Sequence, residues 1–372
     1  MAPRRSRAKS AYGTPVRSSN RQRQLPHPLE EVEAAVKSFK KGKSAGADNV
    51  TAELVQAGGE TQISALLTIC NKIWQRGEWP TPWTQSHIII LPKKGNLQLC
   101  QNYRTINLII KPPERSYAEN LAEPTEAQAE KIIAEEQAGF RPGRSTTGQI
   151  SNLRRLCEKY LQHQQDLCHV FVDFKKAFDR VWHATLWATT RQYNINANLI
   201  RMIQNLYGKA TSTILLNNSK GDWFRTTVGV RQGCVLSPNL FNIVLERIMT
   251  DALNDSQHWW QKKYKLAFCR RHRRPGRNGE EELADLVERL DKMSTAFDIP
   301  INAEKSKLMT INTNGISTDI RVNGEKLDCV NRFKYQGAII ADEGSKPEIF
   351  SPGSPRPQQH SQNSRPSGMT GI

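Results

Sequence analysis

The chain contains 372 residues, of which 37% are hydrophobic and 24% are charged, and its formal net charge is +17. This length is enough for one large domain or two smaller ones with an ample core. No stretch approaches the run of about 18 apolar residues that a membrane-spanning helix needs, and no secretory signal precedes the first expected helix. We therefore expect no membrane partner.

The seven cysteines show no C-x-x-C pairing. Reduced thiols in an intracellular protein, in the nucleus or the cytoplasm, are the plain interpretation of this pattern. We expect no disulfide-linked partner.

The excess positive charge is confined to three segments that contain no acidic residue. Residues 1–24 contain seven Lys or Arg, residues 259–278 contain eight, and residues 351–372 contain two. These segments account for the whole net charge, so bulk charge says little about the domain proper. We expect disordered tails at 1–27 and 346–372, the first being either a nuclear-targeting or nucleic-acid-binding arm or a solvated tail.

Helical spacing of apolar residues predicts helices over residues 29–39 and 63–74, and a short buried strand follows at residues 87–91. The intervening KGKS at 41–44 looks like part of a phosphate-binding loop. The full motif needs a glycine where Lys37 stands, so we reject it.

The second half of the chain mixes the two kinds of element. The patterns predict helices at 150–161, 199–207, 240–253 and 281–297, a hairpin of 213–216 with 223–228, and strands at 170–172, 307–311, 320–322 and 333–340. Strands and helices arranged in this way predict an α+β fold.

Asp173, in the stretch FVDFKKAFD at 171–179, lies where a buried strand stops and a helical pattern from Lys175 begins. Metal-dependent phosphoryl-transfer sites place ligands at strand ends, because the rigid sheet fixes the cation against the substrate phosphates. A turn or cap residue is the alternative interpretation. Asp179 is expected to be a structural carboxylate near the helix start.

Other blocks accompany this stretch in a fixed order. They are LPKKG at 91–95, NYRTI at 102–106, QAGFRPGRS at 137–145 and GVRQGCVLSP at 229–238. The set resembles the reverse transcriptases of non-LTR (LINE-type, jockey-like) retrotransposons over about residues 28–350.

The resemblance implies a right-hand polymerase fold with helical fingers, an α+β palm and an incomplete thumb. It places the fingers and the start of the palm at residues 28–160 and the palm at 161–345, with 259–278 aberrant. The implied partners are an RNA template, a DNA primer and deoxynucleoside triphosphates. The implied cofactor is Mg²⁺, because nucleotide transfer uses two metal ions held by two or three carboxylates.

By the same resemblance, Asp173 is the first metal ligand and Phe178 is the aromatic residue that packs under the sugar, with a core aromatic as the alternative. Lys93 or Lys94 and Arg104 would contact the triphosphate. The block at 229–238 would lie under the template and the incoming base; Arg231 and Gln232 can bond either template or neighbouring backbone. Within this block, the resemblance implies nucleotide contacts for Gln232 and Gly233. It implies template or primer contacts for Gly229, Arg231, Ser237, Pro238, Lys305, Tyr335 and Gly337.

The motif that should supply the other carboxylates, an aromatic-Ala-Asp-Asp turn after the helix at 240–253, is missing. We propose that residues 259–275 are translated out of frame, since permitted codons spell GGRKNTNLRFADDIDGL in the +1 frame and turn Cys269 to His272 into Ala-Asp-Asp-Ile. Residues 111–127 and the chain from Pro352 onward give family-like helices in shifted frames in the same way. Four arginines replace the acids, and like charge opposes metal entry.

The sequence therefore predicts a degraded, inactive copy of a reverse transcriptase domain. Two alternatives stay open. The first is a non-catalytic RNA- or DNA-binding remnant, and the second is a non-functional pseudogene product without a stable fold.

Overall fold

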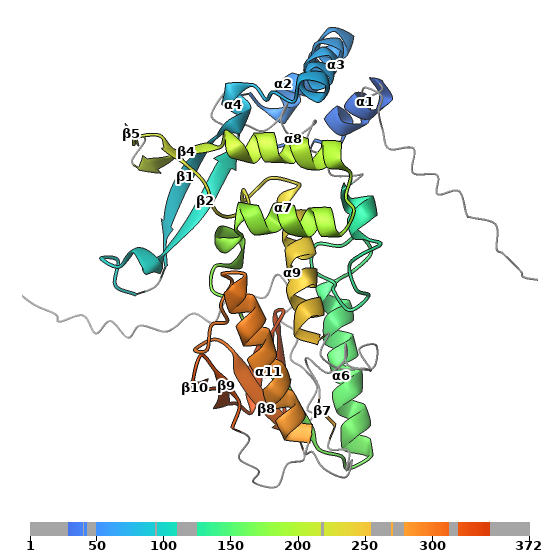
Figure 1. Cartoon of the computed structure of the whole chain (residues 1–372), viewed down its shortest axis with the longest axis vertical. Helices are drawn as coiled ribbons and strands as arrows, with labels where there is room; N and C mark the ends of the chain where they lie inside the picture. Colours follow the sequence, from blue (N-terminus) through green and yellow to red (C-terminus); the bar gives the residue numbers. More distant parts are fainter. Residues whose placement is uncertain are drawn as a thin grey trace, which may run out of the picture. The chain divides into compact units, whose positions relative to one another are not determined.

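The computed structural model describes residues 29–39, 41–42, 50–93, 95–109, 125–216, 219–253, 269–270, 279–311 and 319–342. The described chain is a mixture of helices and strands (Figure 1). It divides into two compact units. The first unit comprises Met1–Gln128, Thr190–Thr227 and Arg231–Ser237, and the second comprises Ala129–Thr189, Val228–Val230 and Pro238–Ile372.

The first unit combines helices with one sheet. Its helices are α1 (Leu29–Lys37), α2 (Ala52–Ala57), α3 (Gly59–Arg76), α4 (Thr81–Thr84), η1 (Cys100–Asn102) and α8 (Ala197–Gly208). Its strands are β1 (Gln85–Pro92), β2 (Tyr103–Ile109), β4 (Thr211–Leu216), β5 (Ser219–Lys220) and β6 (Phe224–Arg225). The sheet has the order β2-β1-β4-β5, and β6 also pairs with β4.

Apolar spacing builds the helical part of this unit. Val32, Val36 and Phe39 of the first helical stretch pack with Val55 and Leu66 in one buried cluster. In the sheet, β1 runs antiparallel to β2 and parallel to β4. The α3 helix ends at Gly77, whose left-handed φ of 71° closes the helix.

The second unit contains a second sheet and its helices. Its helices are α6 (Thr146–Gln162), η2 (Ala177–Arg180), α9 (Ser237–Leu253) and α11 (Gly279–Ala296), and α7 (His183–Gln192) begins in it. Its strands are β3 (Leu167–Phe171), β7 (Cys269–Arg270), β8 (Lys307–Ile311), β9 (Arg321–Val322), β10 (Glu325–Lys326), β11 (Asp328–Cys329), β12 (Arg332–Tyr335) and β13 (Ala338–Ala341). The main sheet has the order β11-β8-β3-β7.

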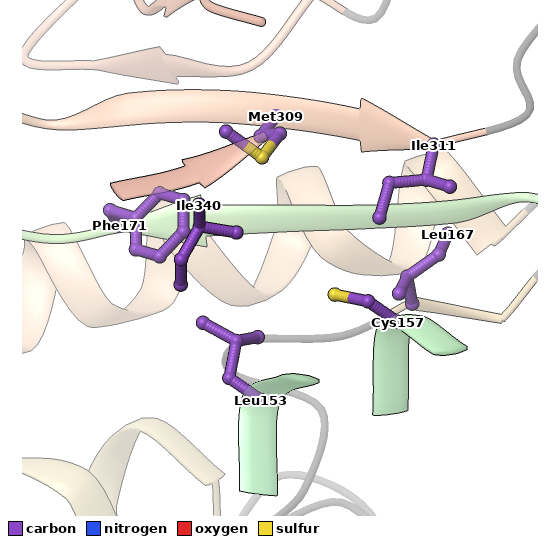
Figure 2. Packing of buried hydrophobic residues seen from close by; sticks show 7 residues of the cluster. All are labelled: Leu153, Cys157, Leu167, Phe171, Met309, Ile311 and Ile340. Carbon is purple, nitrogen blue, oxygen red and sulfur yellow. The ribbon is translucent and has the colours of Figure 1, made fainter. Parts of the chain in front are cut away.

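Strand β3 lies inside this sheet, with antiparallel neighbours β8 and β7 on its two sides. All five of its residues are buried, as expected for a strand covered on both faces. Leu167 and Phe171 pack with Met309 and Ile311 of β8 and with Leu153 of α6, as Figure 2 shows. Burial of this cluster fixes the strand that leads to Asp173.

The predicted elements are largely confirmed. The helices expected at 63–74, 150–161, 199–207, 240–253 and 281–297 correspond to α3, α6, α8, α9 and α11. The segment 333–340 is a hairpin, because Gln336 and Gly337 have left-handed φ values of 51° and 95° that turn the chain. Strand β2 and the helices α2 and α7 were not predicted.

One local prediction is wrong: no helix begins at Lys175. Phe174 instead forms a bridge with Ile301, and Lys175 N donates to Pro300 O at 2.9 Å. Lys176 then has a φ of 49°, and only the short η2 turn follows before α7. Tertiary pairing has overridden the local helical pattern. Residues 111–127, where a shifted frame gives a family-like helix, lie mostly outside the described residues. The same holds for most of 259–278, for the turn at 217–218 and for the two tails.

Candidate active site and nucleic-acid interface

Asp173 lies two residues beyond the end of β3 on a fixed backbone. Its N–H donates to Ser306 Oγ at 3.0 Å, and its carbonyl oxygen accepts from Asn302 N at 2.7 Å. The side chain remains half exposed, at 50%. The sheet therefore presents one carboxylate to solvent from a defined position, as a metal ligand requires.

The charges described around Asp173 do not complete a metal site. Lys305 Nζ lies 4.0 Å from Asp173 Oδ2. Within the described ranges, no group of three or more His, Cys, Asp or Glu side chains could hold a metal ion. One carboxylate beside an ammonium group does not fit a pair of Mg²⁺ ions.

Phe178 lies between two other aromatic rings. It stacks on Phe241 of α9 with ring centroids 4.5 Å apart and meets Phe140 edge-on at 5.6 Å. Phe241 is buried, Phe178 is half-buried and Phe140 is exposed. Phe178 can therefore be both a core aromatic and the residue that packs under a sugar. One side of its ring is packed on Phe241, and it borders the exposed ring of Phe140.

Gly229 is pressed against the segment that contains Phe178. Gly229 N donates to Val181 O at 2.9 Å, and Val230 N donates to Phe178 O at 2.8 Å. The φ of Gly229 is 87°, and an added Cβ would meet Asp179 O at 2.9 Å. His183 Nε2 is 2.9 Å from Gly229 O, and burial lowers the pKa of this histidine. Glycine is required here for close backbone contact within the protein.

Residues Arg231–Ser237 of this block belong to the first unit and form hydrogen bonds within it. Of the two roles open for Arg231, the structure shows the bond to neighbouring backbone: its buried guanidinium donates to Trp83 O at 3.2 Å. Ser237, also buried, donates to Arg231 O at 2.7 Å. Gly233 has a φ of 91°, and a Cβ there would lie 3.4 Å from Asn107 O. Gln232 is partly exposed.

Pro238 is the second residue of α9, in the second unit. The helix expected from residue 240 therefore begins three residues earlier, and proline near its start loses no intrahelical hydrogen bond. Contacts of the block at 229–238 with a template or primer stay predictions.

The structure brings two of the predicted triphosphate-binding residues to one end of the β1–β2 hairpin. Lys93, which follows β1, donates its backbone N–H to Asn102 O at 2.7 Å, and Arg104 is opposite Leu91 in the register. Both Lys93 and Arg104 are exposed. Lys94 lies outside the described residues. Two exposed cations on one rigid hairpin end suit an anionic ligand, and their contact with a triphosphate stays a prediction.

Tyr335 and Gly337 belong to the β12–β13 hairpin of the second unit. Tyr335 is half-buried, with its ring centroid 5.5 Å from that of Phe171, and burial raises its pKa. Gly337 is exposed in the turn. This hairpin is therefore anchored on the aromatic side of the β3 core, while primer contact stays a prediction.

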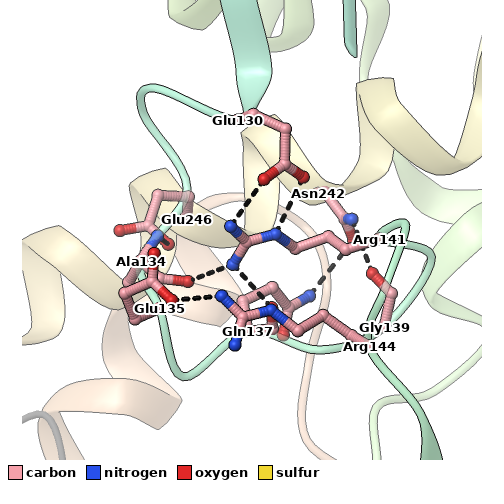
Figure 3. A network of polar contacts seen from close by, with 9 residues as sticks. All are labelled: Glu130, Ala134, Glu135, Gln137, Gly139, Arg141, Arg144, Asn242 and Glu246. Carbon is pink, nitrogen blue, oxygen red and sulfur yellow. Dashed lines mark hydrogen bonds and ion pairs between the residues drawn. The ribbon is translucent and has the colours of Figure 1, made fainter. Parts of the chain in front are cut away.

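Arg141 is a structurally important residue whose role the sequence did not reveal. Its buried guanidinium donates to both carboxylate oxygens of Glu130, at 2.9 and 2.7 Å, and to the backbone oxygens of Ala134 and Gln137 (Figure 3). The hydrogen bond from Arg141 holds the pKa of Glu130 below its usual value. The only sequence signal was its membership of the block at 137–145.

The same loop is attached to α9. Asn242 Nδ2 donates to Gly139 O at 2.8 Å, Gln137 Nε2 donates to Asn242 Oδ1 at 3.1 Å, and Ala134 N donates to Glu246 Oε2 at 3.1 Å (Figure 3). Asn242 and Glu246 lie one helical turn apart, so both reach the loop from one face of α9. The block at 137–145 is thus a rigid loop built against this helix.

Comparison with known proteins identifies the domain. Residues 91–270 match the family model described as reverse transcriptase (RNA-dependent DNA polymerase). The chain is 28% identical over 236 residues to the transposon TX1 uncharacterized 149 kDa protein of Xenopus laevis, which covers 63% of this chain and 18% of that protein. It is 23% identical over 332 residues to the RNA-directed DNA polymerase from mobile element jockey of Drosophila melanogaster, covering 84% and 35%. The chain therefore spans between about a fifth and a third of the length of these relatives.

Solved structures agree on the fold. Apo telomerase from Candida tropicalis, truncated from the C-terminal domain, is similar with a TM-score of 0.51 and 12% identity, over 72% of this chain and 55% of that chain. Telomerase of the same organism in complex with a TWJ fragment of telomeric RNA has a TM-score of 0.51 and 12% identity, over 85% and 52%. The fold is that of the fingers and palm of a right-hand polymerase.

A reverse transcriptase match and retrotransposon relatives on a polymerase fold define the family. Residues 91–270 form a reverse transcriptase domain, and the relatives of the chain are proteins of non-LTR retrotransposons. None of the helices in the described ranges has the length and hydropathy needed to cross a membrane.

Proposed function

We propose that this chain is the fingers and palm of an RNA-directed DNA polymerase that binds template and primer but has lost the polymerisation step. The fingers would occupy residues 28–160 and the palm residues 161–345, with an RNA template, a DNA primer and deoxynucleoside triphosphates as ligands. The telomerase fold neighbour in complex with an RNA fragment supports an RNA template. An intracellular location and Mg²⁺ as the family's cofactor belong to the same proposal.

The observation that carries the loss of polymerisation is the isolation of the Asp173 carboxylate. When bound, paired Mg²⁺ ions would lower the pKa of the primer hydroxyl and neutralise the triphosphate. Asp173 is on the right kind of strand end, but Lys305 Nζ lies 4.0 Å from its carboxylate. Residues 259–278, where the family places further carboxylates, contain eight basic residues and no acid. This donor set favours polyanion binding over cation binding.

Primer extension on an RNA template tests the proposal. We expect the chain to incorporate no more nucleotide than its Asp173→Asn variant, with either Mg²⁺ or Mn²⁺. A repaired chain, in which residues 259–275 are replaced by GGRKNTNLRFADDIDGL, should gain incorporation, because it regains the Ala-Asp-Asp motif that the resemblance expects to supply the other carboxylates. Asp173→Asn in the repaired chain should abolish that gain.

Two outcomes would contradict the proposal. Extension by the unrepaired chain that depends on Asp173 would mean that the centre is intact. Failure of the chain to shift template–primer in a gel at low salt would remove the binding function. Absence of a cooperative thermal transition would support the alternative of a product without a stable fold.

A further inference from the structure

Phe140 combines exposure with an unusual backbone conformation. Its side chain is 60% exposed, and its φ is 57°. A large side chain in the left-handed region is strained, typically by about 1–3 kcal/mol, and such strain persists only where the surroundings impose it. Among the described non-glycine residues with positive φ, Phe140 is the only aromatic; the others are Gln164, Lys176, Asn194, Asp298, Asn323 and Gln336.

The surroundings of Phe140 do impose this conformation. The preceding residue, Gly139, is held through its carbonyl oxygen by Asn242 at 2.8 Å. The following residue, Arg141, is buried and bonded to Glu130 and to two backbone oxygens (Figure 3). Phe140 therefore lies between two fixed points of a rigid loop. The loop presents a flat apolar ring to solvent with little freedom left to lose on binding.

The exposed ring adjoins the residue that the family resemblance assigns to the nucleotide. Phe140 meets Phe178 at 5.6 Å with an interplanar angle of 70°, and Phe178 stacks on buried Phe241. Lys175 and Lys176, just before η2, are both exposed. An exposed aromatic ring that packs against a lysine-containing segment suits single-stranded nucleic acid, because bases stack on the ring and phosphates are attracted to ammonium groups.

We propose that Phe140 is a stacking platform for a nucleobase at the edge of the Phe178 site. The inference rests on the nucleic-acid binding proposed above. It assigns a ligand to an aromatic ring that is 60% exposed. The base comes from a bound single strand or from a free deoxynucleoside triphosphate, which share this chemistry.

Oligonucleotide binding by the full chain tests the inference through three substitutions. Phe140→Leu keeps apolar bulk but removes the flat ring, and it should weaken binding to labelled oligo(dT) and oligo(rU) by at least about fivefold. Phe140→Trp should keep or tighten binding. Phe140→Asn should weaken binding without lowering the melting temperature, since asparagine tolerates left-handed φ.

Three further measurements separate stacking from other roles. On an abasic deoxyribose-phosphate oligomer, the difference between the chain and Phe140→Leu should vanish, and on oligo(dT) the ratio should hold across salt concentrations because stacking involves no counterions. Equilibrium dialysis with dTTP distinguishes the two sources of the base. If Phe140→Leu weakens dTTP binding, the base is that of a free nucleotide; if only oligomer binding falls, the base belongs to the bound strand. Equal binding by the chain and Phe140→Leu in both arms would overturn the inference alone. No binding of oligonucleotide by the unmodified chain would overturn the proposed function, and the inference with it.

Discussion

Lys305 Nζ lies 4.0 Å from Asp173 Oδ2, and both side chains are largely open to solvent, at 70% and 50% exposure. The carboxylate that we predicted to be a metal ligand thus forms a weak, exposed ion pair with a lysine. An exposed pair of this kind contributes little to stability, because solvent screens the attraction and ordering two side chains costs entropy. The chemistry at Asp173 can therefore be altered without disturbing the fold.

We predict that Asp173→Asn changes the unfolding free energy by less than about 0.5 kcal/mol. The substitution leaves both backbone hydrogen bonds of residue 173, to Ser306 and Asn302, in place. Urea denaturation of the two proteins measures the difference. A loss above about 2 kcal/mol would show that the carboxylate is structural, and Asp173→Asn would then be unusable as a catalytic control.

A second prediction concerns the loop that is built against α9. Arg141→Ala should destabilise the protein by about 3–5 kcal/mol, because it removes a buried guanidinium and leaves Glu130 and two backbone oxygens without their donor. Arg144→Ala is the matched control, since Arg144 forms an exposed pair with Glu135 on the same loop and should cost less than about 1 kcal/mol. Equal effects of the two substitutions in urea denaturation would contradict this assignment.

The contrast between Asp173 and Arg141 shows what the sequence could and could not predict. Asp173 was found because a run of apolar residues marks a buried strand and its end locally. The burial of Arg141 depends on Glu130, eleven residues upstream, and on Asn242 more than a hundred residues downstream. No periodicity links these positions.

The same limit explains the wrong helix at Lys175. The pattern there is compatible with a helix, but the bridge between Phe174 and Ile301 joins segments far apart in sequence and fixes extended backbone instead. Strand β2 was missed because its residues, YRTINLI, mix polar and apolar side chains without clear alternation. Long helices such as α9 and α11 were predicted because their apolar faces repeat over several turns.

A third prediction compares Gly229 and Gly337, which both have left-handed φ values but differ in what surrounds them. Gly229→Ala should destabilise by more than about 3 kcal/mol, since it combines left-handed strain with a Cβ 2.9 Å from Asp179 O, a backbone atom that cannot easily move. Gly337→Ala has the strain alone, because a Cβ there meets nothing within 4 Å, and should cost about 1 kcal/mol. Thermal unfolding of both variants gives the order, and a larger loss at Gly337 would contradict it.

The last prediction concerns acid stability and the buried His169 of β3. Burial lowers the pKa of His169 from 6.5 to about 4. Between these values the unfolded chain binds a proton that the folded chain does not, so stability is fully present above pH 6.5 and falls as the pH approaches 4. The full difference corresponds to about 3 kcal/mol. His169→Leu should flatten this part of the curve of unfolding free energy against pH, because the replacement cannot bind a proton in the unfolded chain. An unaltered slope in His169→Leu would assign the acid sensitivity to other groups.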